Sequence, residues 1–188
     1  MKKYILLLIF FVLKPIIAED LEITNWFNQE SEQFLEIMND SKKKDYNFEK
    51  YERFVERNFA LKSISYGLLN EKIIEENNEE TLLKYQDIFK KYLIKTIYNL
   101  ANTTTSGEII LRDIDLKDKI FILNSEIKDG RSSISLYCKV FKANNQYKII
   151  YVIVENTSYF VTKKSEFTKI LRKNRGSLEK LIEELESF

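Results

Sequence analysis

Apolar side chains recur every three or four positions through the first half of the chain, the spacing that places them on one face of an α-helix. This pattern predicts helices at about 21–39, 48–59, 60–69 and 79–102. The last of them carries Leu82, Tyr85 and Phe89 and continues in the same rhythm to Leu100. The acidic stretch between the third and fourth, at 71–80, is expected to be a solvated loop that leads into the long helix.

After residue 107 the period of the apolar positions changes from about 3.6 to two, which is typical of β-strands. Strands are predicted at 108–116, 119–127, 132–143 and 147–155. Short turns separate them, and Asp129-Gly130 is a strong hairpin signal. Two short amphipathic helices are expected to close the chain.

This order of elements predicts the fold class. Four consecutive strands joined by short turns imply an antiparallel meander, and a run of helices followed by a run of strands favours an α+β domain. We therefore expect N-terminal helices packed over one face of a four-stranded antiparallel sheet, with two short helices at the C-terminus.

Residues 1–18 differ in character from the rest. Lys2 and Lys3 precede the apolar run 4–13, and Pro15 interrupts the chain shortly before Ala18. This arrangement is typical of a signal peptide, and the run is too short to span a membrane. We expect cleavage after Ala18 and a single domain at 19–188. The alternative is an uncleaved anchor or a buried N-terminal helix.

Charge and size limit the classes of function. The chain has 188 residues, of which 44% are apolar and 13% aromatic, enough for one core and an apolar ligand site. It has 30 basic and 29 acidic residues, and loss of the three lysines before Ala18 would leave 27 basic residues and a net charge near −2. A nucleic-acid-binding protein usually carries a surplus of basic residues, so we do not expect this protein to bind nucleic acid.

Residues suited to catalysis or metal binding are scarce. There is no histidine, and Cys138 is the only cysteine, so neither a zinc site nor a disulfide is expected. Asp113 and Asp115 could do acid–base chemistry, but alternate positions on the wet face of a sheet explain them better. Cys138 shares an alternating face with Ile134, Leu136 and Val140, which indicates a buried structural thiol.

The end of the chain resembles the MlaC family, also called toluene-tolerance proteins. In that family a Val-rich strand with a Glu is followed by a polar turn, an aromatic residue that opens a helix, and a Gly before a Leu-rich helix. Here "VIVENTS" is followed by Phe167, Leu171 and Gly176. Upstream, "YQDIFKKYLIKTIYNL" and "NFEKYERFVERNF" are similar to the two helices that precede the sheet.

Two positions depart from the family pattern. Tyr151 stands where the family has an Asp, which removes an acidic partner for the basic residue represented here by Lys164. Asn156 replaces a Gly, and Asn also tolerates the left-handed backbone that a Gly adopts.

The resemblance implies a roll similar to that of ketosteroid isomerases and a non-enzymatic function. Members are periplasmic phospholipid-binding proteins that carry lipid between an inner-membrane ABC transporter complex and an outer-membrane lipoprotein complex of an Mla system. It implies a monomer that holds phospholipid as cargo and needs no cofactor or metal. The expected pocket lies between the long helix and the strands and is lined by Phe89, Leu93, Ile97, Ile134, Leu136, Val140, Val152 and Val154.

Two other functions fit the same pattern. One is an enzyme on the same roll that acts on a hydrophobic substrate with a Tyr and a carboxylate. The other is a periplasmic chaperone or adaptor that binds hydrophobic polypeptide in an apolar groove. Periodicity does not separate them, because a filled core and a hollow one use the same residue types.

Overall fold

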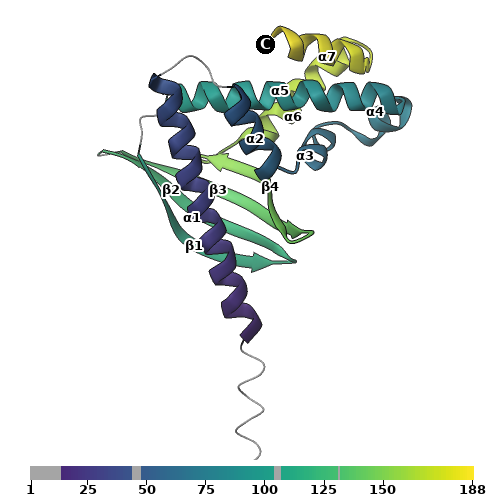
Figure 1. Cartoon of the computed structure of the whole chain (residues 1–188). Coiled ribbons are helices and arrows are strands. Elements are labelled where there is room, and N and C mark those ends of the chain that lie inside the picture. The colour runs from purple at the N-terminus through teal and green to yellow at the C-terminus, as the bar shows by residue number, and fades with distance from the viewer. Residues whose placement is uncertain (1–13, 44–47, 104–106, 131) are drawn as a thin grey trace, which may run out of the picture.

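The computed structural model describes residues 14–43, 48–103, 107–130 and 132–188. Helices come first, then an antiparallel sheet, then two more helices (Figure 1). The first helices are α1 (Lys14–Lys43), α2 (Phe48–Asn58), α3 (Leu61–Gly67), α4 (Glu71–Glu76) and α5 (Glu79–Thr103). The strands are β1 (Glu108–Lys117), β2 (Ile120–Asp129), β3 (Ser132–Ala143), β4 (Gln146–Val154) and β5 (Thr157–Ser158), followed by α6 (Tyr159–Lys173) and α7 (Leu178–Ser187).

Side chains cap several of the described helices at their N-termini, among them α5, where Asn78 accepts from the main-chain N–H of Thr81 at 2.8 Å. Asn70 accepts a hydrogen bond from the main chain of α4, Ser158 caps α6 and Ser177 caps α7. Such caps satisfy backbone N–H groups that have no partner within the helix. They fix where the closing helices begin.

The sheet is an antiparallel meander in the order β1-β2-β3-β4-β5. Its tight turns use residues in the left-handed region, among them Asn144, Asn145 and Asn156. The register shifts once in β1, at Arg112, and once in β4, at Ile150. A shift of this kind is a bulge, and it changes which side chains face inward beyond it.

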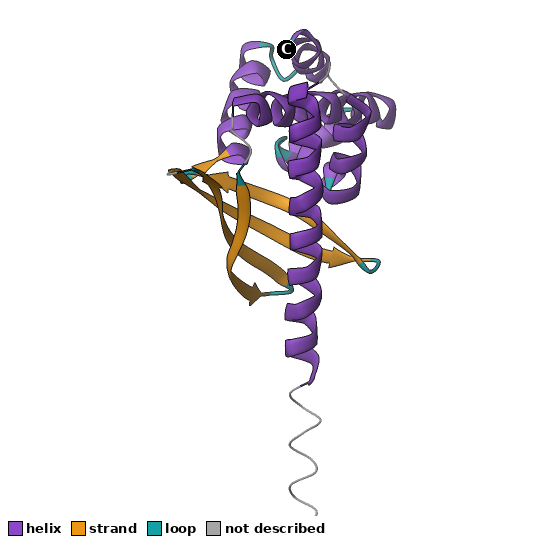
Figure 2. Cartoon of the chain, turned by 60° about the vertical axis from the view of Figure 1, so that its left-hand side comes forward, coloured by secondary structure: helices purple, strands orange, loops and turns teal. Residues whose placement is uncertain are grey.

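Helix α1 crosses one face of the sheet, while the other helices gather on the β4 side (Figures 1 and 2). Helices α2, α3 and α6 contact β4, and α5 packs against α7. The domain is therefore an α+β roll in which α1, α2 and α5 stand over the inner face of the sheet.

Two clusters of buried side chains hold the fold together. The larger one joins α2, α3, α4, α5, α6 and α7 around Tyr85, Phe89 and Phe167, and Met38 of α1 also belongs to it. The smaller one packs Ile23 and Phe27 of α1 against Phe121, Leu123, Cys138, Val140 and Tyr147 of the sheet. Fully burying one such side chain stabilises a fold by about 1.5–3 kcal/mol.

The predicted fold class is confirmed, with differences in detail. The structure adds β5, which makes five strands, and α1 is longer than the predicted 21–39. The expectation of a loop at 71–80 was wrong in part, because Glu71–Glu76 forms a helix that buries Ile73. Residues 1–13 of the predicted signal peptide lie outside the described residues. Among the helices of the described ranges, none combines the length and the apolar character needed to cross a membrane.

Candidate functional site

A cavity of about 200 Å³ lies between α1, α2, α5 and the inner face of the sheet. All but two of its lining side chains are apolar or the thiol of Cys138; the exceptions are Glu30 and Ser31. The lining residues are Trp26, Phe27, Glu30, Ser31, Phe34, Leu35, Met38, Phe54, Phe59, Ile97, Ala101, Ile109, Ile127, Ile134, Leu136, Cys138, Ile149, Val152 and Val154. An apolar enclosure with one polar spot suits a ligand that is mostly hydrocarbon.

Helix α1 forms the outer wall of this cavity. Phe27, Phe34 and Met38 recur at helical spacings, so their side chains follow one face of the helix toward the sheet. Phe34 stacks on Phe54 of α2, with ring centroids 5.2 Å apart, which joins the two helical walls.

The sheet supplies the opposite wall. In β3 the alternating positions Ile134, Leu136 and Cys138 all line the cavity. In β4 the bulge at Ile150 allows both Ile149 and Val152 to face inward although they are three residues apart. The bulge therefore continues the apolar wall across β4.

Five of the residues expected in the pocket line this cavity: Ile97, Ile134, Leu136, Val152 and Val154. Ile97 contributes from α5, and the other four come from β3 and β4. The structure thus brings together residues that are up to 57 positions apart in the sequence, counted from Ile97 to Val154.

The other three expected residues are elsewhere. Phe89 and Leu93 belong to the filled core of the helical layer, where the ring of Phe89 meets that of Phe167 at 6.5 Å between centroids. Val140 is fully buried in the smaller core, with Phe121 and Tyr147. These three side chains therefore lie outside this cavity, in packed core.

Much of the cavity wall comes from residues that the sequence predicts only as helix stripes. Trp26, Phe27, Phe34, Leu35 and Met38 follow the helical period of α1, and Phe54 that of α2. The helical spacing of these residues predicts that their side chains are buried, but it does not predict that they border a cavity. For Glu30, the one charged side chain in the lining, the sequence holds no signal.

Glu30 is held in a polar cluster beside the cavity. The guanidinium of Arg57 donates to its carboxylate at 2.6 Å, and the amide of Asn58 donates to the same oxygen at 2.7 Å. Arg57 also donates to Gln33. The side chain of Glu30 is 12% exposed and that of Arg57 is 48% exposed, so the cluster reaches from the cavity wall to solvent.

Cys138 lies in the cavity wall and is buried. Burial raises the pKa of its thiol to about 12, because a thiolate is poorly solvated among apolar side chains. The thiol therefore stays protonated and weakly nucleophilic at neutral pH.

Few described side chains in this cavity carry groups suited to acid–base chemistry. No tyrosine lines it, and Glu30 is its single carboxylate, so the Tyr–carboxylate pair of a ketosteroid-type site is not formed there. Asp113 and Asp115 are exposed on β1. Within the described ranges no three His, Cys, Asp or Glu side chains gather as they would around a metal ion.

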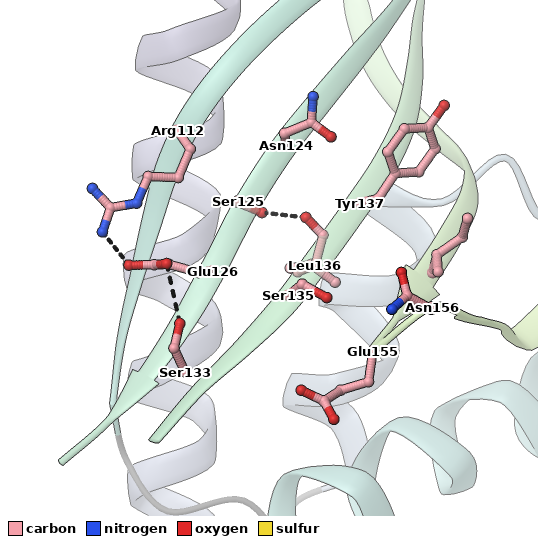
Figure 3. Close-up of a pocket in the computed structure, with 11 residues that line it drawn as sticks. Arg112, Asn124, Ser125, Glu126, Ser133, Ser135, Leu136, Tyr137, Glu155 and Asn156 are labelled. Carbon is pink, nitrogen blue, oxygen red and sulfur yellow. Dashed lines mark hydrogen bonds and ion pairs between the residues drawn. The ribbon is translucent and has the colours of Figure 1, made fainter. Parts of the chain in front are cut away.

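Two other hollows are more polar or more open. One lies on the sheet face away from α1, where Arg112 pairs with Glu126 and Glu126 accepts from Ser133 at 3.1 Å (Figure 3). The other is a groove of about 620 Å³ between α5 and α7 that includes Tyr92, Lys95 and Phe188. Both have a larger polar share in their lining than the cavity under α1, whose lining is almost entirely apolar.

The positions that depart from the MlaC pattern have their own contacts. Tyr151 stacks on Phe160 at 5.5 Å between ring centroids, and Lys164 donates to the carbonyl of Gly67 at 2.9 Å. Asn156 adopts a φ of 61°, in the left-handed region as expected. Lys164 thus donates to the end of α3, and no carboxylate of the described ranges pairs with it.

Comparison with known proteins agrees with the fold and with the sequence motifs. A family model described as MlaC protein matches residues 28–187. No curated protein sequence matches the chain. A solved structure of a phospholipid-binding protein from Ralstonia solanacearum, in complex with a phospholipid, is similar with a TM-score of 0.70 and 20% identity. The similarity covers 85% of this chain and 92% of that one. Because the family model spans most of its length, the chain belongs to the MlaC family.

Proposed function

We propose that the protein binds the acyl chains of a phospholipid in the cavity beneath α1. The observation that carries this proposal is the apolar lining of the cavity, which has one charged side chain at one place. Two further facts support it: the chain belongs to the MlaC family, and the similar protein from Ralstonia solanacearum was solved with a phospholipid.

The energetics of lipid binding suit such a cavity. Each methylene that leaves water is worth about 0.8 kcal/mol, so the free energy of binding accumulates along an acyl chain without any specific polar contact. Ile134, Leu136 and Val152 offer branched aliphatic surface, and Phe34 and Phe54 offer aromatic surface. The binding energy is then spread over many side chains.

The cavity must widen to accept this ligand. A cavity of about 150 Å³ holds one benzene ring, so one of about 200 Å³ is too small for two long acyl chains. An outward movement of α1 would work against two kinds of contact: the packing of Ile23 and Phe27 in the smaller core, and ion pairs that join the helix to its neighbours at three places. Lys142 pairs with Glu22 at 2.7 Å, and Arg57 pairs with Glu30. Such pairs are each worth roughly 0.2–1 kcal/mol.

In this proposal the protein is an exported carrier. A signal peptide at 1–18 would deliver the domain at 19–188 to the periplasm. There it would shuttle phospholipid between an inner-membrane ABC transporter complex and an outer-membrane lipoprotein complex, as a monomer. A carrier needs tight enclosure of the chains and no turnover, and the buried, protonated thiol of Cys138 offers no nucleophile at neutral pH.

Native mass spectrometry of the freshly purified protein, followed by extraction of the released ligand, tests this function. We expect a mass increment equal to an intact diacyl phospholipid, and we expect chelators to leave it unchanged. Recovery of hydrolysed lipid would indicate an enzyme and contradict the carrier. A protein that carries no lipid but binds hydrophobic peptide would favour the adaptor.

A further inference from the structure

The polar spot in the cavity wall consists of two neighbouring residues on α1, Glu30 and Ser31. All other described lining residues are apolar apart from the thiol of Cys138. An amphiphile with its hydrocarbon in the cavity therefore has one described place in this wall for its polar end. Glu30 extends from there to the exposed guanidinium of Arg57, so this place also has access to water.

Two cations lie on the α2 side of this spot. Arg57 uses one terminal nitrogen for Glu30 and Gln33, which leaves other guanidinium N–H groups at a side chain that is 48% exposed. Lys148 of β4 donates to the main-chain carbonyl of Glu56 at 3.0 Å and also to that of Arg57. The pKa of Lys148 is lowered chiefly by burial and further by the nearby charge of Arg57, so the two cations lie close together.

Two acceptors belong to the same cluster: Glu30, which lines the cavity, and the fully buried Asn58, which does not. Glu30 offers a carboxylate that is only 12% exposed. Beside it, the Oδ1 atom of Asn58 is buried and has no hydrogen-bond partner among the described residues. A buried acceptor without a donor is costly, so its neighbourhood favours a ligand that brings donors.

We propose that this cluster recognises the head group of a zwitterionic phospholipid, with the phosphate at Arg57 and the ammonium group at Glu30. The proposal rests on the proposed function and names the class of its cargo. A phosphodiester fits the fork of a guanidinium, with Lys148 adding positive charge behind it. An ammonium group fits a carboxylate, and Glu30 uses one carboxylate oxygen, Oε2, for both Arg57 and Asn58.

The same charges disfavour a head group that has only negative charge. A phosphatidylglycerol head would place its phosphate near Arg57 but would offer no cation to Glu30. A phosphatidylethanolamine head satisfies both. The two lipids share the same acyl chains and phosphodiester, so the difference in binding arises from the pairing with Glu30.

A competition between these two lipids tests the assignment. Delipidated protein is incubated with vesicles of phosphatidylethanolamine and phosphatidylglycerol in equal amounts, with identical acyl chains, and bound lipid is counted by native mass spectrometry. We expect about a two- to fivefold excess of bound phosphatidylethanolamine, the range given by one partly exposed ion pair. Glu30→Gln should bring the ratio close to one by lowering the binding of phosphatidylethanolamine, while the amide oxygen still accepts from Asn58 and keeps the cluster in place.

The second variant and two matched controls separate recognition from a general charge effect. Arg57→Gln should lower the binding of both lipids by about two- to fivefold, because both carry the phosphate. Glu52→Gln removes a carboxylate that pairs with Lys90, and Arg53→Gln removes a cation that pairs with Glu49; both lie on α2 and outside the cavity lining. These controls should keep the wild-type ratio and total.

The outcomes distinguish this assignment from the proposed function. Wild-type protein that takes up both lipids equally contradicts the head-group assignment and leaves the carrier function intact. The same holds if Glu52→Gln changes the ratio as much as Glu30→Gln does. Protein that takes up neither lipid contradicts the carrier function, and the head-group assignment with it.

Discussion

Leu93 and Ile97 lie one turn apart on α5, yet only Ile97 lines the cavity. Leu93 is 3% exposed and belongs to the filled core that α5 shares with α6 and α7. The boundary between packed core and hollow interior therefore passes between two neighbouring turns of one helix.

This boundary predicts opposite results for the same substitution. Leu93→Glu should leave the protein unfolded, because an unpaired buried charge costs about 3–5 kcal/mol of a total stability of roughly 5–15 kcal/mol. Ile97→Glu should fold but lose its lipid, since the cavity has room for waters of about 30 Å³ each around the carboxylate. Circular dichroism and native mass spectrometry on the same samples measure both effects. A folded Leu93→Glu protein would contradict the boundary.

Filling the cavity should stabilise the protein and abolish lipid binding. Ala101 lines the cavity and is 3% exposed, so Ala101→Phe adds a ring where there is empty space. Cavity-filling changes commonly add about 0.5–2 kcal/mol, which raises the midpoint of thermal unfolding of the lipid-free protein. Val161→Phe, at a residue that is 62% exposed, is the control and should change neither property. If the Ala101→Phe protein were destabilised and kept its lipid, the cavity beside Ala101 would have no room for the added ring and would not be the lipid site.

Cys138 predicts a loss of stability at alkaline pH. Its folded-state pKa is raised to about 12 from 9.0, so between these values the folded protein holds a proton that the unfolded chain has released. The contribution of this thiol to the free energy of unfolding is therefore fully present below pH 9 and decreases as the pH rises above 9. At pH 10 the loss is about 1.4 kcal/mol.

Urea unfolding at pH 7 and pH 10 measures this loss against Cys138→Val, which keeps the volume of the side chain but has no thiol. Other groups titrate in both proteins, so the difference between them isolates Cys138. Equal losses in both proteins would mean that the thiol is not buried in the cavity wall.

Much of the fold could be predicted from the sequence, because period and turn chemistry are local. The rhythm of Leu82, Tyr85 and Phe89 indicated α5, and Asp129-Gly130 indicated the hairpin between β2 and β3. The helix at Glu71–Glu76 was not recognised, since Ile73 is the one buried residue in an acidic run.

The candidate site was only partly predictable, because a hollow depends on what lies opposite. The alternation of β3 indicated that Ile134, Leu136 and Val140 share a face, but Ile23 and Phe27 of α1 fill the space at Val140. In β4, strict alternation from Tyr147 would turn Val152 outward, and the bulge at Ile150 turns it inward. The hydrophobic period of a segment does not reveal which element packs opposite it or where a bulge occurs.

The central claim is that acyl chains lie between α1, α5 and the inner face of the sheet. Photocrosslinking with a phosphatidylethanolamine that carries a diazirine near the end of one acyl chain tests it most directly. After irradiation and digestion, we expect label on peptides that contain cavity residues such as Phe34, Ile97, Leu136 and Val152. Label concentrated instead on the α5–α7 groove at Tyr92 and Phe188, with none on α1 or the strands, would contradict the account.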